Sequence, residues 1–128
     1  MILITGGAYQ GKTEYVRRQF PDIPITDGAA CLFDEAATAK CINQYHVLIQ
    51  RLHAAGSDPV AWTEQLCAAN PECIIILDEI GCGIIPLERD ERMRRELTGI
   101  CGCIIAKHSD AVIRLVCGVP HAIKGDLL

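Results

Sequence analysis

Ile2-Leu3-Ile4-Thr5-Gly6-Gly7-Ala8-Tyr9-Gln10-Gly11-Lys12-Thr13 is the stretch that decides the fold of this chain. Its second part, Gly6 to Thr13, fits the pattern G-x-x-x-x-G-K-S/T at every fixed position. Glycines let the backbone curl so that successive N–H groups can point at one phosphate. An apolar strand is expected before the loop, at Met1–Thr5, and a helix after it, at Lys12–Phe20, which Pro21 ends. This context predicts a P-loop that binds a nucleoside triphosphate.

Individual side chains of the P-loop have expected roles. Lys12 should reach the β- and γ-phosphates of ATP or GTP, and the hydroxyl of Thr13 should ligate Mg²⁺. The helix that begins near Lys12 adds its positive dipole end. The alternative is a glycine-rich turn that binds nothing, but such a turn needs neither the lysine nor the threonine. The expected nucleotide-binding residues are Gly6, Gly7, Ala8, Tyr9, Gln10, Gly11, Lys12 and Thr13.

Acidic residues follow two of the expected strands. The apolar run Cys73–Leu77 is typical of a strand that is buried on both faces, and it ends in Asp78-Glu79. In P-loop enzymes an acid at this place holds Mg²⁺, and a neighbouring glutamate orients or deprotonates the attacking hydroxyl. Asp27 follows a short strand at Ile23–Thr26 and is a third candidate, with a turn-forming Asp-Gly pair as the alternative. We expect Lys12, Glu79 and Asp27 to be catalytic and Asp78 to join Thr13 at the metal. Successive strand side chains point to opposite faces, so one of Asp78 and Glu79 should face the metal, and the sequence leaves open which. It also leaves open whether Asp27 supports the metal in place of Asp78.

Strands and helices alternate along the remaining chain. We expect helical structure over Asp34–Ala55, a helix from Pro59 to Asn70 and a long helix over Glu88–His108. Val112–Val119 is the expected last strand, ended by Pro120. This alternation predicts an α/β fold in a single domain over residues 1–128, with a mostly parallel sheet and helices on both faces.

Composition excludes several classes of protein. The net charge of −4 argues against a nucleic-acid-binding face. The longest apolar run, Cys73–Leu77, is too short to span a membrane, and the start of the chain lacks the features of a secretory signal. We therefore expect a cytoplasmic protein. Its eight cysteines show no Cys-x-x-Cys and no zinc spacing, so reduced thiols that act as small hydrophobic side chains are expected.

Three further stretches carry a resemblance to a known family. They are Glu79-Ile80-Gly81-Cys82-Gly83-Ile84-Ile85-Pro86, then Arg92-Met93-Arg94-Arg95-Glu96-Leu97-Thr98-Gly99, and finally Gly118-Val119-Pro120 with Lys124. Together with the P-loop, they make the chain resemble the adenosylcobinamide kinase / adenosylcobinamide-phosphate guanylyltransferase family of cobalamin biosynthesis. The resemblance implies a RecA-like P-loop domain, phosphorylation of the hydroxyl of the corrinoid adenosylcobinamide with ATP or GTP, and a trimer. It also implies a second step, in which GMP is transferred from GTP through a guanylylated histidine.

The chain departs from the family pattern at that histidine. Six residues separate Phe20 from Asp27, so the family segment that carries the histidine is missing. His46 lies on an apolar helical stripe, where a packed core histidine is expected. The histidines that do not match the family position are His46, His53, His108 and His121.

The leading interpretation is a kinase-type transferase. One alternative is a non-catalytic or regulatory nucleotide-binding relative, and another is full bifunctionality with His46 as a relocated nucleophile. The mixed-charge start of the long helix is either a solvated face or, in a homo-oligomer, the place from which Arg92 or Arg95 reaches a neighbour's phosphates.

Overall fold

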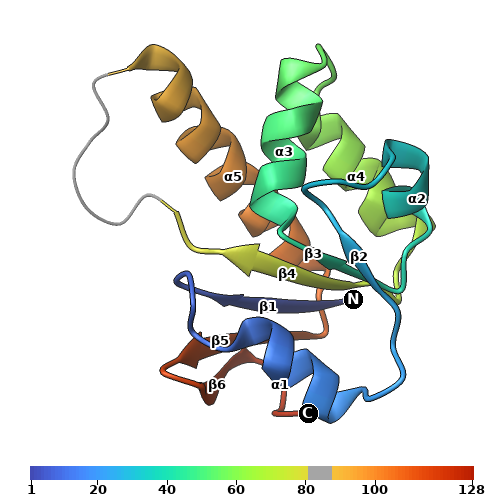
Figure 1. Cartoon of the computed structure of the whole chain (residues 1–128), viewed down its shortest axis with the longest axis vertical. Coiled ribbons are helices and arrows are strands. Elements are labelled where there is room, and N and C mark those ends of the chain that lie inside the picture. The colour runs from blue at the N-terminus through green and yellow to red at the C-terminus, as the bar shows by residue number, and fades with distance from the viewer. Residues whose placement is uncertain (81–87) are drawn as a thin grey trace.

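The computed structural model describes residues 1–80 and 88–128. Figure 1 shows a sheet between helices that lie on both of its sides. The Gly81–Pro86 part of the family resemblance lies outside the described residues. The elements in chain order are β1 (Ile2–Gly6), α1 (Lys12–Gln19), β2 (Ile25–Asp27), α2 (Phe33–Ala37), β3 (Cys41–Asn43), α3 (Tyr45–Ala54), α4 (Pro59–Ala69), β4 (Ile74–Asp78), α5 (Arg89–His108), β5 (Ala111–Val116) and β6 (Val119–Lys124).

The six strands form one sheet in the order β2-β3-β4-β1-β5-β6. The pairs from β2 to β5 are parallel, and β6 runs antiparallel to β5. The sheet is therefore mostly parallel, as expected. In the register of β1 with β4, Gly6 lies opposite Asp78, so the start of the P-loop and the acidic end of β4 meet at one edge.

Alternating side chains of the central strands supply two hydrophobic cores. Leu3 of β1 and Ile75 of β4 belong to the larger core, which is built with α3, α4 and α5. Ile4 and Ile76 belong to the second core, which is built with α1. Strand β4 is buried on both faces, which explains why it is apolar at every position before Asp78.

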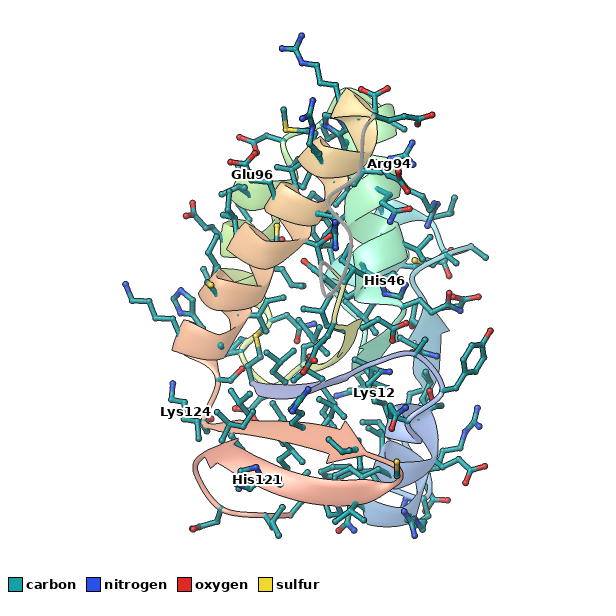
Figure 2. All side chains as sticks on the ribbon, turned by 90° about the vertical axis from the view of Figure 1, so that its left-hand side faces the viewer. Lys12, His46, Arg94, Glu96, His121 and Lys124 are labelled. Carbon is teal, nitrogen blue, oxygen red and sulfur yellow. The ribbon has the colours of Figure 1, made fainter. Side chains whose placement is uncertain are left out.

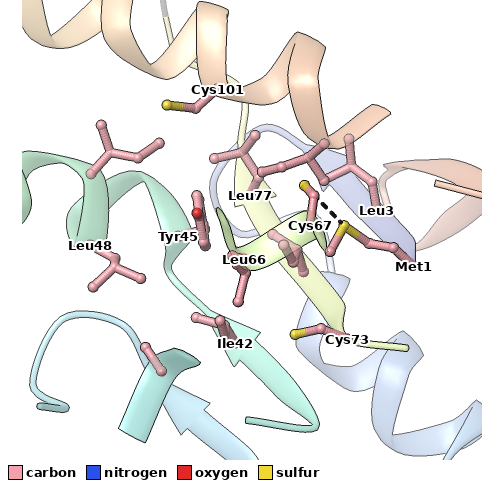
Figure 3. Packing of buried hydrophobic residues seen from close by; sticks show 14 of the residues in the cluster. Met1, Leu3, Ile42, Tyr45, Leu48, Leu66, Cys67, Cys73, Leu77 and Cys101 are labelled. Carbon is pink, nitrogen blue, oxygen red and sulfur yellow. Dashed lines mark hydrogen bonds between the residues drawn. The ribbon is translucent and has the colours of Figure 1, made fainter. Parts of the chain in front are cut away.

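Sulfur atoms take part in the larger core. Figure 3 shows Cys67 beside Met1, where the Cys67 thiol donates to the Met1 sulfur at 3.7 Å. Burial raises the pKa of the Cys41 and Cys73 thiols to about 12. The seven cysteines among the described residues are free, and five of them are buried. These five thiols therefore act as small apolar side chains.

Three helices form at the places where the sequence predicts them. The α1 helix begins at Lys12, and Asp58 caps α4 by accepting hydrogen bonds from the amides of Val60 and Ala61. Pro59 occupies the first position of α4, where its missing N–H costs nothing. The long α5 begins one residue after Glu88. Among the described helices, none is both long and apolar enough to cross a membrane.

The expectation of continuous helical structure over Asp34–Ala55 is wrong. The short strand β3 interrupts it, between the five-residue α2 and the start of α3. Residues 41 and 42 of β3 pair with Ile74 and Ile75 of β4. Strand pairing with distant residues overrides helical spacing here, because a three-residue strand is too short to show a period of its own.

The expectation that β5 continues to Val119 is also wrong. A two-residue turn at Cys117 and Gly118, both with positive φ, reverses the chain into β6. Pro120 does not end the last strand but lies within β6, opposite Leu115. Proline is tolerated there because β6 is an edge strand.

Candidate functional site

The loop between β1 and α1 requires glycine at its two ends. Gly6 has a φ of 142°, and a Cβ there would lie 2.5 Å from the backbone oxygen of Leu115. Gly11 has a φ of 88° and caps α1 in the left-handed conformation. Tyr9 at the loop apex is also left-handed, with its side chain fully exposed. This backbone path fits the conformations that the glycines of the P-loop pattern permit.

The same loop is fastened to the turn between β5 and β6. The side-chain oxygen of Gln10 accepts a hydrogen bond from the amide of Cys117 at 2.5 Å. The backbone oxygen of Gln10 accepts another from the amide of Gly118 at 3.0 Å. The unexpected strand β6 thus places its turn against the P-loop.

Lys12 lies at the centre of the site. Its side chain is only 6% exposed, and its Nζ donates to the backbone oxygen of Gly7 at 2.6 Å. Nζ also lies 2.8 Å from Oδ1 of Asp78, which is the last residue of β4. The fold therefore joins two residues that are 66 positions apart in the sequence and holds a lysine charge inside the molecule with a carboxylate partner.

His46 in the first turn of α3 faces the same carboxylate, and Figure 2 shows it on the same side of the molecule as Lys12. Its Nε2 lies 3.6 Å from Oδ2 of Asp78. Burial lowers the pKa of His46, while the charge of Asp78 raises it and the charge of Lys12 lowers it. Its Nδ1 is buried and lacks a hydrogen-bond partner among the described residues. The expectation of a packed core histidine is wrong, because the first turn of α3 presents His46 to the end of β4.

These residues line a cavity of about 470 Å³. The sequence predicted its P-loop residues and Asp78 and offered His46 as an alternative nucleophile, but Glu14, Asn43 and Gln44 were not predicted. Asn43 and Gln44 are reachable from the sequence only if β3 is recognised, because they lie at the carboxyl end of that strand. The lining residues are Ala8, Tyr9, Gln10, Gly11, Lys12, Thr13, Glu14, Asn43, Gln44, His46 and Asp78.

Glu79 points to different surroundings. Its two carboxylate oxygens accept hydrogen bonds from Nε and a terminal nitrogen of Arg114, at 2.7 and 3.0 Å. The pair lines a neighbouring cavity of about 380 Å³ together with Gly7 and Gln10. Successive residues of an extended chain point to opposite sides, so Asp78 contacts Lys12 whereas Glu79 contacts Arg114. Arg114 was not expected from the sequence, because it lies within the apolar β5.

Asp27 lies apart from the Lys12 cavity. It ends β2, and both β3 and β4 lie between β2 and β1 in the sheet. Its Oδ1 accepts a hydrogen bond from the amide of Ala29, so it forms the turn that was the alternative interpretation. Arg51 of α3 holds this turn through the backbone oxygens of Gly28 and Cys31.

The arginines at the start of α5 lie away from this site. Figure 2 shows Arg94 and Glu96 on the half of α5 that is distant from Lys12. Arg92 is exposed and Arg95 is partly exposed. Their contact with a neighbouring subunit stays a prediction.

Comparison with known proteins adds one finding to this geometry. The family model described as cobinamide kinase / cobinamide phosphate guanyltransferase matches residues 22–123. The match spans most of the chain and begins after the P-loop. No curated protein matches the chain.

Proposed function

Because the chain belongs to the cobinamide kinase / cobinamide phosphate guanyltransferase family, we propose that it phosphorylates the hydroxyl of adenosylcobinamide with ATP or GTP. The family itself implies a transferase of cobalamin biosynthesis. The observation that carries the kinase proposal is the buried Lys12 beside Asp78, at the edge where the P-loop begins. A lysine and a carboxylate at these places match the parts that phosphoryl transfer requires.

In this proposal the residues from Gly6 to Thr13 hold the triphosphate. When the triphosphate binds, the Lys12 ammonium group leaves the Asp78 carboxylate and binds the β- and γ-phosphate oxygens. It does so because the phosphates offer more negative charge than one carboxylate. The positive end of α1 adds to the attraction. The sequence shows no motif that would distinguish adenine from guanine, so ATP and GTP are equal candidates.

Thr13 and Asp78 are the residues that would hold Mg²⁺. Both line the cavity of about 470 Å³, and hydroxyl and carboxylate oxygens are the donors that Mg²⁺ prefers. The ion would neutralise charge that develops on the transferred phosphoryl group. We propose Asp78 for this role in place of Asp27, because the side chain of Asp27 is engaged in a turn.

Glu79 is the proposed group that orients or deprotonates the acceptor hydroxyl. It follows Asp78 directly, and Arg114 holds its carboxylate in a fixed position. The acceptor oxygen forms a bond to the γ-phosphorus as the bond to the β,γ-bridging oxygen breaks. The hydroxyl proton passes to the Glu79 carboxylate, and the nucleoside diphosphate leaves.

The experiment is incubation of the pure protein with adenosylcobinamide, Mg²⁺ and either ATP or GTP labelled at the γ-phosphate. We expect label to appear in the corrinoid. Tight nucleotide binding with no labelled corrinoid, while an active family member performs the reaction, would favour the non-catalytic alternative and refute the kinase.

A second candidate activity is guanylyl transfer through His46. The observation that favours it is the largely buried His46 imidazole within the Lys12 cavity, beside Asp78. Its nitrogen would attack the α-phosphorus of GTP and release pyrophosphate, and the corrinoid phosphate would then displace the histidine. Because burial lowers the pKa of His46, its imidazole is neutral and nucleophilic near neutral pH.

Label from α-labelled GTP tests this second activity. The wild type and the variant His53→Ala should retain acid-labile label, whereas His46→Ala should lose it. Label that survives in His46→Ala would exclude His46 as the nucleophile.

We also propose, from the family resemblance, that the protein acts in the cytoplasm as a homotrimer. Light scattering on the purified protein measures the assembly. A monomer that is fully active would refute the trimer.

A further inference from the structure

A second cavity shares Asp78 as a lining residue with the cavity that contains Lys12. It occupies about 360 Å³ between α5 and the carboxyl ends of β1 and β4. Leu3, Thr5 and Leu77 line it from the sheet, and Gly99, Gly102 and Cys103 line it from α5. We call it the α5 cavity.

Small residues on α5 create this space. A Cβ at Gly99 would meet no atom within 4 Å. A Cβ at Gly102 would lie 3.3 Å from Cδ2 of Leu77, so a larger side chain there would reach into the space. Each glycine makes α5 less stable than alanine would, by about 1 kcal/mol. At Gly99 a side chain would not clash with the sheet, so close packing does not explain this cost.

The charged groups that line the α5 cavity are already paired. Asp78 and Glu79 line it, and they form ion pairs with Lys12 and Arg114. No lysine or arginine is among its described lining residues, so these surroundings offer no free cation to an anion such as a second phosphate. A neutral ligand with an apolar body and a few hydroxyl or amide groups fits them.

Thr98 supplies an independent sign of a ligand. It lines the α5 cavity, it is only 4% exposed, and its hydroxyl oxygen has no hydrogen-bond partner among the described residues. A buried hydroxyl without a partner costs about 1–3 kcal/mol. Threonine in a helix has two accessible rotamers, so its hydroxyl can turn toward a bound polar group.

The α5 cavity adjoins the proposed reaction site. Asp78 lines both this cavity and the cavity that contains Lys12. A hydroxyl in the α5 cavity would therefore lie beside Asp78 and Glu79, next to the cavity proposed to hold the γ-phosphate. The two cavities together offer separate places for a phosphate donor and for an acceptor.

We propose that the α5 cavity binds the uncharged, hydroxyl-bearing arm of the acceptor, with the Thr98 hydroxyl as a positioning group. The inference rests on the proposed kinase function and adds the place where its acceptor lies. A volume near the lower end of the range for ligand pockets, about 300–1,000 Å³, suits an amide- and hydroxyl-bearing arm and leaves a large ring outside.

Steady-state kinetics with adenosylcobinamide and ATP test the proposal. Gly99→Leu and Gly102→Leu should raise the KM for the acceptor at least about tenfold and change the KM for ATP less than about twofold. Ile100→Leu is the matched control, because Ile100 is exposed and lies outside the lining of the α5 cavity. Thr98→Val should raise the acceptor KM with little effect on ATP, and an unchanged acceptor KM would remove the hydroxyl from the proposal.

A binding measurement separates this proposal from the proposed function. Cys103 is exposed and lines the α5 cavity, so its alkylation by N-ethylmaleimide can be followed by peptide mass spectrometry. Saturating adenosylcobinamide should slow alkylation of Cys103 at least about fivefold, whereas ATP alone should not. Protection without phosphoryl transfer would refute the kinase and support the cavity. Phosphoryl transfer by the wild type, without protection and with an unchanged KM in both glycine variants, would overturn the cavity and leave the kinase standing.

Discussion

At the scale of single residues, the site depends on one buried charge pair. Lys12 forms an ion pair with Asp78 and also donates to the backbone oxygen of Gly7 in the P-loop. Because both charges are largely shielded from water, the electrostatic interaction of each with a third charge in the cavity is expected to be strong. The lysine is therefore both a structural partner of β4 and the proposed ligand of the phosphates.

Lys12→Met should abolish most of the proposed phosphoryl transfer. Loss of a preorganised charge at the transferred group typically lowers kcat by about 100- to 1,000-fold, and the methionine keeps the length of the side chain. The measurement is kcat with γ-labelled nucleotide. Lys40→Met is the matched control, because Lys40 is exposed at the opposite end of β3. Equal losses in the two variants would contradict a specific role for Lys12.

His46→Gln should make stability less dependent on pH. Burial lowers the pKa of His46 below its ordinary value of 6.5, so the unfolded chain takes up a proton that the folded chain does not. The free energy of unfolding of the wild type should consequently fall as the pH drops from 6.5 toward about 5. Urea unfolding should show a shallower fall for His46→Gln.

The exposed His53 provides the control for this pH dependence. His53→Gln should retain the slope of the wild type. The same slope in all three proteins would show that His46 does not titrate differently in the folded and unfolded states.

At the scale of elements, the contact between α3 and α4 fixes the start of α3. The hydroxyls of Tyr45 and Thr63 lie 2.8 Å apart, and both side chains are completely buried. Tyr45 immediately precedes His46, so this hydrogen bond also orients the first turn of α3 toward Asp78. The position of His46 thus depends on the packing of Tyr45 against α4.

Tyr45→Phe should destabilise the protein by about 1–2 kcal/mol, because it leaves the Thr63 hydroxyl buried without its tyrosine partner. Chemical unfolding measures the change. Tyr15→Phe is a close control, since the Tyr15 hydroxyl is buried without a hydrogen-bond partner among the described residues. Its removal should be neutral or stabilising, and a larger loss for Tyr15→Phe than for Tyr45→Phe would contradict this account.

Element boundaries were predictable where the signal was local. Asp58 with Pro59 marks the start of α4, and the P-loop pattern marks the start of α1. The strands β3 and β6 were not predictable, because β3 is too short to show a period and Pro120 is normally a strand breaker. Both strands exist because partners that are distant in sequence accept their hydrogen bonds.

At the scale of the whole molecule, the two hydrophobic cores determine which thiols can react. Five of the described cysteines are buried, while Cys103 and Cys117 are exposed. The raised pKa of Cys41 and Cys73, about 12, leaves almost no thiolate at neutral pH.

Native labelling should therefore separate the cysteines by position in the fold. We expect N-ethylmaleimide to modify Cys103 and Cys117 at least about tenfold faster than Cys41 and Cys73, and this difference should vanish in urea. Mass spectrometry of the peptides gives each rate separately. Rapid native labelling of Cys41 or Cys73 would show that the cores open more readily than their packing indicates.

The sequence by itself determined the P-loop, the strand that ends in Asp78, the α/β class and the family resemblance. The P-loop and the acidic strand end are local, since each lies in a few consecutive residues, and the class and the resemblance follow from several such local patterns along the chain. Only the tertiary structure decided that His46 joins Lys12 and Asp78, that Arg114 holds Glu79, and that Asp27 stays in a turn. The physical reason is that strand order and register, which no local pattern encodes, set which side chains meet at the edge of the sheet.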